Sequence, residues 1–403
     1  MSRTIFAGGS VFDGSAGLAG ADVAVEDGRI VDVGPGLDGD EAVDLAGKAL
    51  LPGMFDCHTH VMVSPDRLDT NKEIETPFSI WFYVAIENLR RTLALGITTV
   101  RDAGGADLGV KQAVADGLVA GPRLHIATAV LSQSGGHADG WLPSGYDFTP
   151  VVWPGMPSGI VDGPDEMRRR VREVIRAGAD QVKVCTSGGV LSPRDDPRHG
   201  HFRDAELAVL VEEATAAGIP VMAHAQGAPG IKAAVRAGIR SIEHGIFLDD
   251  EAIGMMLERG TWLVPTLSAP QGVLDAEAAG AAIPAAALRK AHEVIEIHRA
   301  AVRKAIEAGV KVAMGTDSGV TPHGQNLREL ALMVDCGMTP LDAMLATTRS
   351  AAELVGVADD RGSIEKGKRA DLVVVDGDPF AYADLTARVT AVYQDGRLVS
   401  GSA

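Results

Sequence analysis

Cysteine, aromatic residues and clustered positive charge are all scarce in this chain of 403 residues. Its three cysteines, Cys57, Cys185 and Cys336, cannot all pair and none belongs to a C-x-x-C motif, so we expect free thiols in a cytoplasmic protein. The formal net charge is −17 and no long Lys/Arg cluster occurs, which argues against nucleic-acid partners and anionic membrane surfaces. No apolar run approaches the ~20 residues of a membrane-spanning helix, and the N-terminal residues MSRTIFAGGS do not resemble a signal peptide.

Short alternating runs typical of strands occupy both ends of the chain. Examples are DVAVEDGRIVDVG near the N-terminus and ADLVVVDGDP near the C-terminus, each containing an Asp-Gly turn. Neither end has enough strands for a stable sheet of its own. We therefore predict that residues 1–52 and 356–403 pair into one small β-sandwich domain.

Residues 53–355 alternate between strand-like runs and amphipathic segments with helical spacing. Eight such runs can be counted: LLPGMFDCHTH, ITTVRD, RLHIA, QVKVC, PVMAHA, RSIEH, TWLVPT and KVAMGTD. Strict alternation predicts a parallel sheet, and eight strands favour a closed (β/α)8 TIM-like barrel, so the fold class is α/β. A doubly wound open sheet is the alternative, but no G-x-G-x-x-G fingerprint supports it.

Residues that can bind metal lie at the C-terminal ends of these predicted strands, where barrel enzymes place their active sites. The set comprises His58, His60, Lys183, His224, His244 and Asp317. Each alone has a structural explanation, such as an ion pair for the lysine or a helix N-cap for the aspartate. Their coincidence predicts a metal site instead. Four imidazoles and a carboxylate suit zinc, and a buried lysine of depressed pKa can capture carbon dioxide as a carbamate that bridges two metals.

Several motifs, in this order, resemble the amidohydrolase superfamily over essentially the whole chain. They are LPGMFDCHTH, TTVRDAGG, KVCTSGGVLSP, MAHAQG, SIEHG, GTDSG and GSIEKGKRADLVVVDGDP. The resemblance is to the branch of prolidase-like and Xaa-Arg/Lys carboxypeptidase-like enzymes related to imidazolonepropionase. It implies a hydrolase that cleaves the amide bond of a dipeptide or N-acyl amino acid by a metal-bridging hydroxide.

The same resemblance implies a role for each residue of the predicted site. One metal would be held by His58, His60 and Asp317, and the other by His224 and His244, with carboxylated Lys183 between them. Asp317 would also act as general base and then acid. His137, in the loop SQSGGHADG, would stabilise the oxyanion, unless it is only a solvated loop residue.

The number of metals separates the leading hypothesis from its alternatives. Mononuclear deaminases and cyclic-amide hydrolases of the superfamily lack the lysine of the fourth strand, so Lys183 favours two ions. A non-catalytic scaffold with the same fold would be expected to have lost ligands, whereas all six are present. The expected partner is a small-molecule amide or peptide, and a homo-oligomer is expected for a soluble enzyme.

Candidate substrate-binding residues lie in loops after the strands. Trp141, Tyr146 and Trp153 crowd the loop after the third strand and suit an apolar substrate group, or pack against one another. Arg194 could pair a substrate carboxylate, although its neighbouring aspartates could also pair it. Gln226 stands where dipeptidases of this branch have a tyrosine, which makes aryl amides, carbamates or ureas an alternative substrate class.

Overall fold

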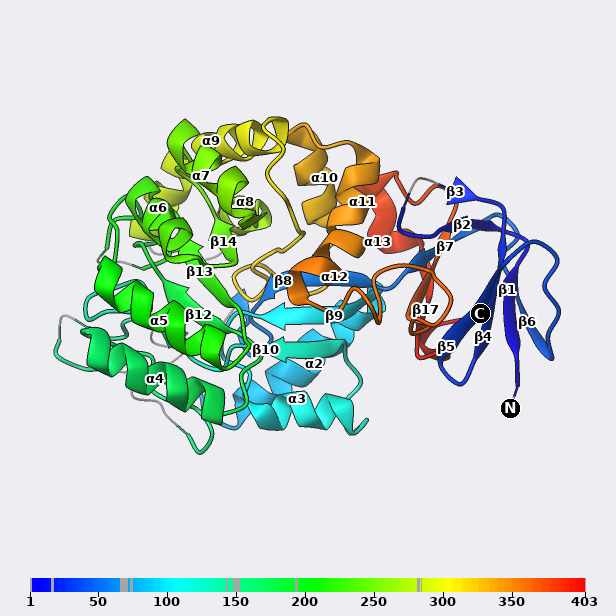
Figure 1. The fold of residues 1–403 in the computed structure, drawn as a ribbon, viewed down its shortest axis with the longest axis horizontal. Coiled ribbons are helices and arrows are strands. Elements are labelled where there is room, and N and C mark those ends of the chain that lie inside the picture. Colours follow the sequence, from blue (N-terminus) through cyan, green and yellow to red (C-terminus); the bar gives the residue numbers. More distant parts are fainter. Residues whose placement is uncertain are drawn as a thin grey trace.

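The computed structural model describes residues 2–15, 18–65, 72, 75–142, 144–147, 153–192, 195–280, 283 and 285–402. Strands from the two chain ends form one lobe, at the right of Figure 1, which holds both termini. The rest of the chain forms an α/β body in which helices surround parallel strands. The two lobes adjoin where strand β7 (Lys48–Pro52) leads into β8 (Met54–Thr59).

Two mixed sheets make up the lobe of the chain ends. A six-stranded sheet has the order β18-β17-β16-β7-β2-β3, and a four-stranded sheet has the order β5-β4-β1-β6. The strands are β1 (Thr4–Ala7), β2 (Ser10–Phe12), β3 (Leu18–Ala19), β4 (Asp22–Glu26), β5 (Arg29–Gly34), β6 (Glu41–Asp44), β16 (Leu372–Asp376), β17 (Val389–Gln394) and β18 (Arg397–Gly401). Side chains from β1, β2, β4, β5, β7, β16 and β17 share one apolar cluster, in which the rings of Phe6 and Tyr393 meet edge to face at 4.9 Å. The prediction that both termini build one sheet region is therefore confirmed, whereas the exact domain boundaries stay a prediction.

Parallel strands form the interior of the larger lobe. One sheet has the order β10-β9-β8 and another the order β11-β12-β13-β14-β15. These strands are β9 (Ile97–Asp102), β10 (Arg123–Ile126), β11 (Val130–Leu131), β12 (Val182–Cys185), β13 (Val221–Ala225), β14 (Ser241–His244) and β15 (Trp262–Val264). Seven of the eight predicted runs thus contain a strand, and the short β11 was not predicted. The residues of β8, β9 and β12 to β15 are buried on both faces, as expected for strands covered by helices, whereas β10 and β11 each contain half-buried residues.

The eighth run, KVAMGTD, is not a regular strand, and that part of the prediction is wrong. Its backbone makes isolated parallel bridges, Val312 with Leu263 of β15 and Ser318 with Thr59 of β8. Between these bridges the backbone still bonds to β8, from the amide of Cys57 to Met314 and from the amide of Asp317 to His58. No regular strand forms, because the amide of Thr316 also lies 3.1 Å from Oδ1 of Asp56 and Asp317 has a positive φ of 59°. The segment nevertheless lies between β15 and β8. A closed barrel stays a prediction.

Helices cover the outside of the parallel strands, with α4 to α7 flanking β12 to β14 in Figure 1. They are α2 (Ile80–Ala94), α3 (Leu108–Ala115), α4 (Pro164–Arg176), α5 (Asp204–Ala216), α6 (Ala228–Ala237), α7 (Asp250–Arg259), α8 (Ser268–Ala278), α9 (Ala285–Glu307), α10 (Arg328–Asp335), α11 (Pro340–Ala346), α12 (Arg349–Val355) and α13 (Leu385–Arg388). In α4, Met167, Val171 and Val174 form the buried stripe of an amphipathic helix. Within the described residues, no helix is both long enough and apolar enough to cross a membrane.

Candidate metal-dependent active site

The predicted ligands converge on one cavity at the C-terminal ends of the parallel strands. The cavity has a volume of about 250 Å³. It is lined by all six predicted ligands, His58, His60, Lys183, His224, His244 and Asp317, together with His137 and Gln226. Much of the remaining wall is apolar and includes Val130, Val190, Leu191, Ile246 and Val273. Residues from distant parts of the sequence therefore meet as predicted.

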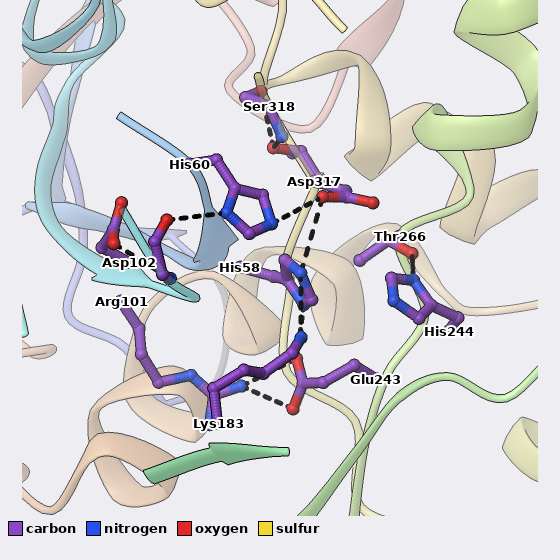
Figure 2. Close-up of polar contacts among 12 residues, drawn as sticks. His58, His60, Arg101, Asp102, Lys183, Glu243, His244, Thr266, Asp317 and Ser318 are labelled. Atoms are coloured by element: carbon purple, nitrogen blue, oxygen red, sulfur yellow. Dashed lines mark hydrogen bonds and ion pairs between the residues drawn. The ribbon is translucent and has the colours of Figure 1, made fainter. Parts of the chain in front are cut away.

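Asp317 faces His58, on β8, and His60, the residue that follows this strand (Figure 2). Its Oδ1 lies 3.5 Å from Nε2 of His58 and 3.3 Å from Nε2 of His60. Ligand atoms of His58, His244 and Asp317 all lie within 4.8 Å of one another. Three such donors at this spacing can surround one cation.

Each of the two β8-side histidines uses one ring nitrogen to bind a protein acceptor. His58 donates from Nδ1 to Oε2 of Glu243 at 2.7 Å, and His60 donates from Nδ1 to the carbonyl oxygen of Gly104 at 2.9 Å. These bonds place a proton on Nδ1 of both rings, so the lone pair of the neutral form of each ring is on Nε2. A histidine that binds metal is held in this way by a partner on its other nitrogen.

The other two histidines are held in the same manner. His224 donates from Nε2 to the carbonyl oxygen of Gly188 at 3.0 Å, which leaves Nδ1 for a ligand. His244 places Nδ1 2.7 Å from Oγ1 of Thr266. The two rings lie 4.7 Å apart. All four imidazoles thus combine one anchored nitrogen with one nitrogen available in the cavity.

A buried ion pair supports His58 from behind. Glu243 is fully buried and Arg101, on β9, is 4% exposed. The guanidinium donates to both oxygens of Glu243 at 2.9 and 3.0 Å, to the carbonyl oxygen of Cys57 at 2.6 Å and to Oγ of Ser241 at 3.0 Å. Because the carboxylate is compensated and hydrogen-bonded, it can remain charged in the interior and orient His58.

Burial keeps most of the site neutral. It lowers the pKa of His58, His224 and His244 well below the ordinary value, and neighbouring positive groups lower it further. The pKa of His60 is raised on balance, since the hydrogen bond and charge of Asp317 outweigh the opposing effect of burial. Neutral imidazoles have the lone pairs that a divalent cation requires.

Lys183 is the unusual member of the set. Its Nζ lies 3.4 Å from Nε2 of His58, and within the described part of the chain it forms no ion pair with a carboxylate. Burial lowers the pKa of its amine. The described residues therefore do not support the alternative that Lys183 is simply the partner of a buried carboxylate. A neutral amine can react with carbon dioxide.

The backbone is strained where the site is built. His244 has φ 70° and Asp317 has φ 59°, and Thr266, the partner of His244, has φ 51°. Left-handed conformations are uncommon for residues other than glycine. Such strain tends to occur at functional sites, where surrounding structure holds a side chain in place.

Acid–base partners of Asp317 also set its charge. Burial alone would raise the pKa of Asp317, but the electrostatic influence of His58, His60 and Lys183 and a hydrogen bond with His60 hold it well below its ordinary value. The carboxylate is therefore ionised at neutral pH, as both a metal ligand and a general base must be.

Of the predicted substrate-binding residues that the structure describes, Gln226 lines the cavity and the three aromatic residues do not. Gln226 follows β13, is buried and has an Oε1 atom without a hydrogen-bond partner among the described residues. Trp141 and Tyr146 are 47% and 51% exposed, and neither lines the cavity as described. Trp153 donates from Nε1 to Asp107 at 2.9 Å, away from the cavity lining. Contact of these rings with substrate thus requires a substrate that extends beyond the cavity. Arg194 lies outside the described residues.

Sequence reasoning missed the residues that hold the ligands. Arg101 and Glu243 each sit inside a predicted strand run, ITTVRD and RSIEH, and a charge in the interior of such a run was the available signal. Thr266 follows β15 and carries no pattern that points to His244. The carbonyl oxygen of Gly104 has no side-chain signature at all.

A family profile, a relative of known sequence and two crystal structures are all similar to nearly the whole chain. The profile described as "Amidohydrolase family" matches residues 49–399. An ochratoxinase of Aspergillus niger is 35% identical over 368 residues, which cover 87% of this chain and 76% of that protein. A crystal structure of a Xaa-Pro dipeptidase with bound methionine superposes with a TM-score of 0.90 at 34% identity, covering 98% of this chain and 99% of the other. A prolidase complexed with N-methylphosphonate-L-proline has a TM-score of 0.90 at 36% identity, covering 99% and 100%.

Proposed function

The chain belongs to the amidohydrolase family, and we propose that it hydrolyses the amide bond of a small molecule with two divalent ions in the cavity. Membership makes it a hydrolase that acts on carbon–nitrogen bonds. The observation that carries the proposal is the arrangement of the four histidines. Each has one ring nitrogen bonded to the protein and the other available beside a carboxylate or a second imidazole.

The proposed ligand assignment follows the pattern that the family resemblance implies. His58, His60 and Asp317 would hold one ion, and His224 and His244 would hold the other, although His244 also lies close to His58 and Asp317. Lys183, carboxylated by carbon dioxide, would contribute to both. Nitrogen and oxygen donors of this kind suit zinc. When bound, such ions activate a water molecule and polarise the carbonyl group under attack.

The proposed roles of the protein residues follow from charge and position. Asp317, ionised and directed at His58 and His60, accepts a proton from the attacking water and passes it to the leaving nitrogen. His137 lines the same cavity and stacks on His224 with ring centroids 4.0 Å apart. From there it stabilises charge that develops on the carbonyl oxygen.

The substrate class proposed first is a dipeptide or an N-acyl amino acid. Similarity to a Xaa-Pro dipeptidase and to an ochratoxinase supports it. A second class consists of neutral aryl amides, carbamates or ureas. The apolar wall of the cavity favours this second class, while the unpartnered Oε1 of Gln226 can accept a hydrogen bond from a substrate N–H group of either class.

Architecture and assembly are proposed on the same basis. The similarity to whole amidohydrolase chains supports a closed (β/α)8 barrel over residues 53–355, flanked by a domain of residues 1–52 and 356–403. The backbone from Val312 to Ser318 would take the position of the eighth strand of that barrel, between β15 and β8. We also propose a cytoplasmic homo-oligomer with no nucleic-acid or membrane partner.

Elemental analysis combined with a substrate panel tests the function. Protein expressed with zinc should contain two ions per chain and release free amine from at least one of dipeptides, N-acyl amino acids, aryl amides, carbamates or ureas. The variant His58→Asn/His60→Asn should lose one ion and the activity. One ion or none in folded wild-type protein contradicts the two-metal site. Ammonia release, with no cleavage of acyclic amides, would favour a deaminase.

A further inference from the structure

A buried lysine on α9 ties down the loop that follows β12. Lys290 is 6% exposed, and its Nζ donates to the carbonyl oxygens of Gly189, Ser192 and Asp195 at 2.9, 2.7 and 2.7 Å. An ammonium group has three N–H donors, and here all three bind the backbone of one loop. Such charge-assisted bonds in the interior hold the loop in a single conformation.

The side chains of this loop point their polar atoms at His137. The Oγ of Ser192 donates to the carboxylate of Asp195 and lies 2.8 Å from Nδ1 of His137. A hydroxyl has one proton, and the carboxylate takes it, so Oγ can only accept from the imidazole. Nδ1 of His137 therefore carries a proton, and Nε2 is the nitrogen that this network leaves for substrate. Oδ2 of Asp195 lies 3.7 Å from the same Nδ1.

The ring of His137 is also fixed by packing. A Cβ atom placed on Gly189 would lie 2.2 Å from Cε1 and 2.3 Å from Nδ1 of His137, so the ring rests directly on the glycine backbone. The imidazole of His224 stacks on the ring at an interplanar angle of 15°. Only a residue without a side chain fits at position 189.

We propose that Lys290, Asp195 and Ser192 are positioning residues that fix the ring orientation and the tautomer of His137. Lys290 holds the loop, Asp195 orients the hydroxyl of Ser192, and that hydroxyl accepts the Nδ1 proton. Helix α9 thereby controls a group that faces the reacting carbonyl. The inference rests on the proposed function, because it assigns His137 to the substrate.

The kinetic test compares Ser192→Ala with a matched control. Ser134 and Asp162 form a similar pair, with Oγ donating to the carboxylate at 2.6 Å, but both are exposed and neither contacts His137. Loss of a residue that orients a functional histidine typically lowers activity by ~10- to 100-fold. We expect that loss in kcat for Ser192→Ala with little change in KM, retention of activity in Ser192→Thr, and wild-type kinetics in Ser134→Ala.

A direct readout of the tautomer keeps the inference separate from the activity. Protein labelled with nitrogen-15 in histidine should show His137 protonated at Nδ1, with its signals identified by their loss in His137→Asn. Ser192→Ala and Asp195→Asn should change that signal, whereas Ser134→Ala should not. Lys290→Met should have the same effect through the loop.

Three outcomes separate the two proposals. An active wild type with kcat and tautomer both dependent on Ser192 supports the inference. An active wild type for which Ser192→Ala matches Ser134→Ala in both measurements overturns it. An inactive wild type whose tautomer depends on Ser192 contradicts the proposed function and leaves the positioning network supported.

Discussion

Replacing Arg101 and Glu243 singly and together separates two contributions of the buried ion pair to the site. Arg101→Met removes the cation. The fully buried carboxylate of Glu243 then has no counter-charge and keeps its hydrogen bond to His58. Glu243→Met leaves the buried guanidinium without a counter-charge. Breaking a buried pair in this way typically costs about 3–5 kcal/mol of unfolding free energy. Each single variant should lose that amount in urea denaturation of metal-free protein.

The double variant should lose less stability than the sum of the two single losses. With both charges gone, no buried ion remains uncompensated, and apolar replacement of a buried pair is often close to neutral. The carbonyl oxygen of Cys57 does lose its donor, and Nδ1–H of His58 loses its acceptor. Each unsatisfied buried group costs about 1–3 kcal/mol, so we expect a loss of about 2–6 kcal/mol for Arg101→Met/Glu243→Met.

The three variants should rank differently in zinc affinity than in free energy of unfolding. Glu243 is the acceptor that fixes the tautomer of His58, so Glu243→Met and the double variant both lose it. Removal of such a partner lowers metal affinity by ~10- to 100-fold, which is about 1.4–2.7 kcal/mol. Arg101→Met keeps the acceptor and should bind zinc nearly as the wild type does. Competition with a chromophoric chelator measures this.

Two results would refute the reasoning. If the stability losses of the single variants simply add in the double variant, to about 6–10 kcal/mol, the two charges do not compensate each other. If zinc affinity is equal in Glu243→Met and Arg101→Met, the carboxylate does not orient His58.

The remaining predictions concern individual side chains. Lys183→Ala should lose activity and one of two ions, with partial rescue by short carboxylic acids; full activity by kinetic assay would make the lysine structural. Asp317→Asn should lower kcat/KM by at least ~10²-fold. Wild-type kcat/KM should fall towards acid pH, because the carboxylate must be ionised and its lowered pKa keeps it so at neutral pH. Trp153→Ala, which removes a hydrogen bond to Asp107, should lower the melting temperature, whereas exposed Trp141→Ala should change stability by no more than ~0.5 kcal/mol.

The strands could be predicted because each is a short apolar run whose pattern is local. Ile97–Asp102, for example, coincides with the predicted run. KVAMGTD has the same local pattern and differs only through distant partners. The carboxylate of Asp56, far earlier in the chain, binds the amide and hydroxyl of Thr316, and the backbone there bonds to β8 without forming a regular ladder. A contact of that range leaves no mark on local periodicity.

The candidate ligands could be predicted because their chemistry and their place at strand ends are both visible in the sequence. Their supporting partners could not, since Glu243 reaches His58 across the sheets and the partner of His60 is a backbone oxygen. The aromatic loop illustrates the opposite case. Trp141 and Tyr146 are close in sequence to His137, yet loop conformation places them at the surface.

The pairing of β7 with β16 bears on how the chain is made. Leu50 lies opposite Val374, so one edge of β7 has no partner until the chain as far as β16 has left the ribosome. β7 continues directly into the strand that carries His58. Pairing across such a separation forms slowly, and an unpaired apolar edge invites association with other chains. The strand that carries His58 thus adjoins an edge that is completed only after β16 has been made, and termination before β16 leaves that edge exposed.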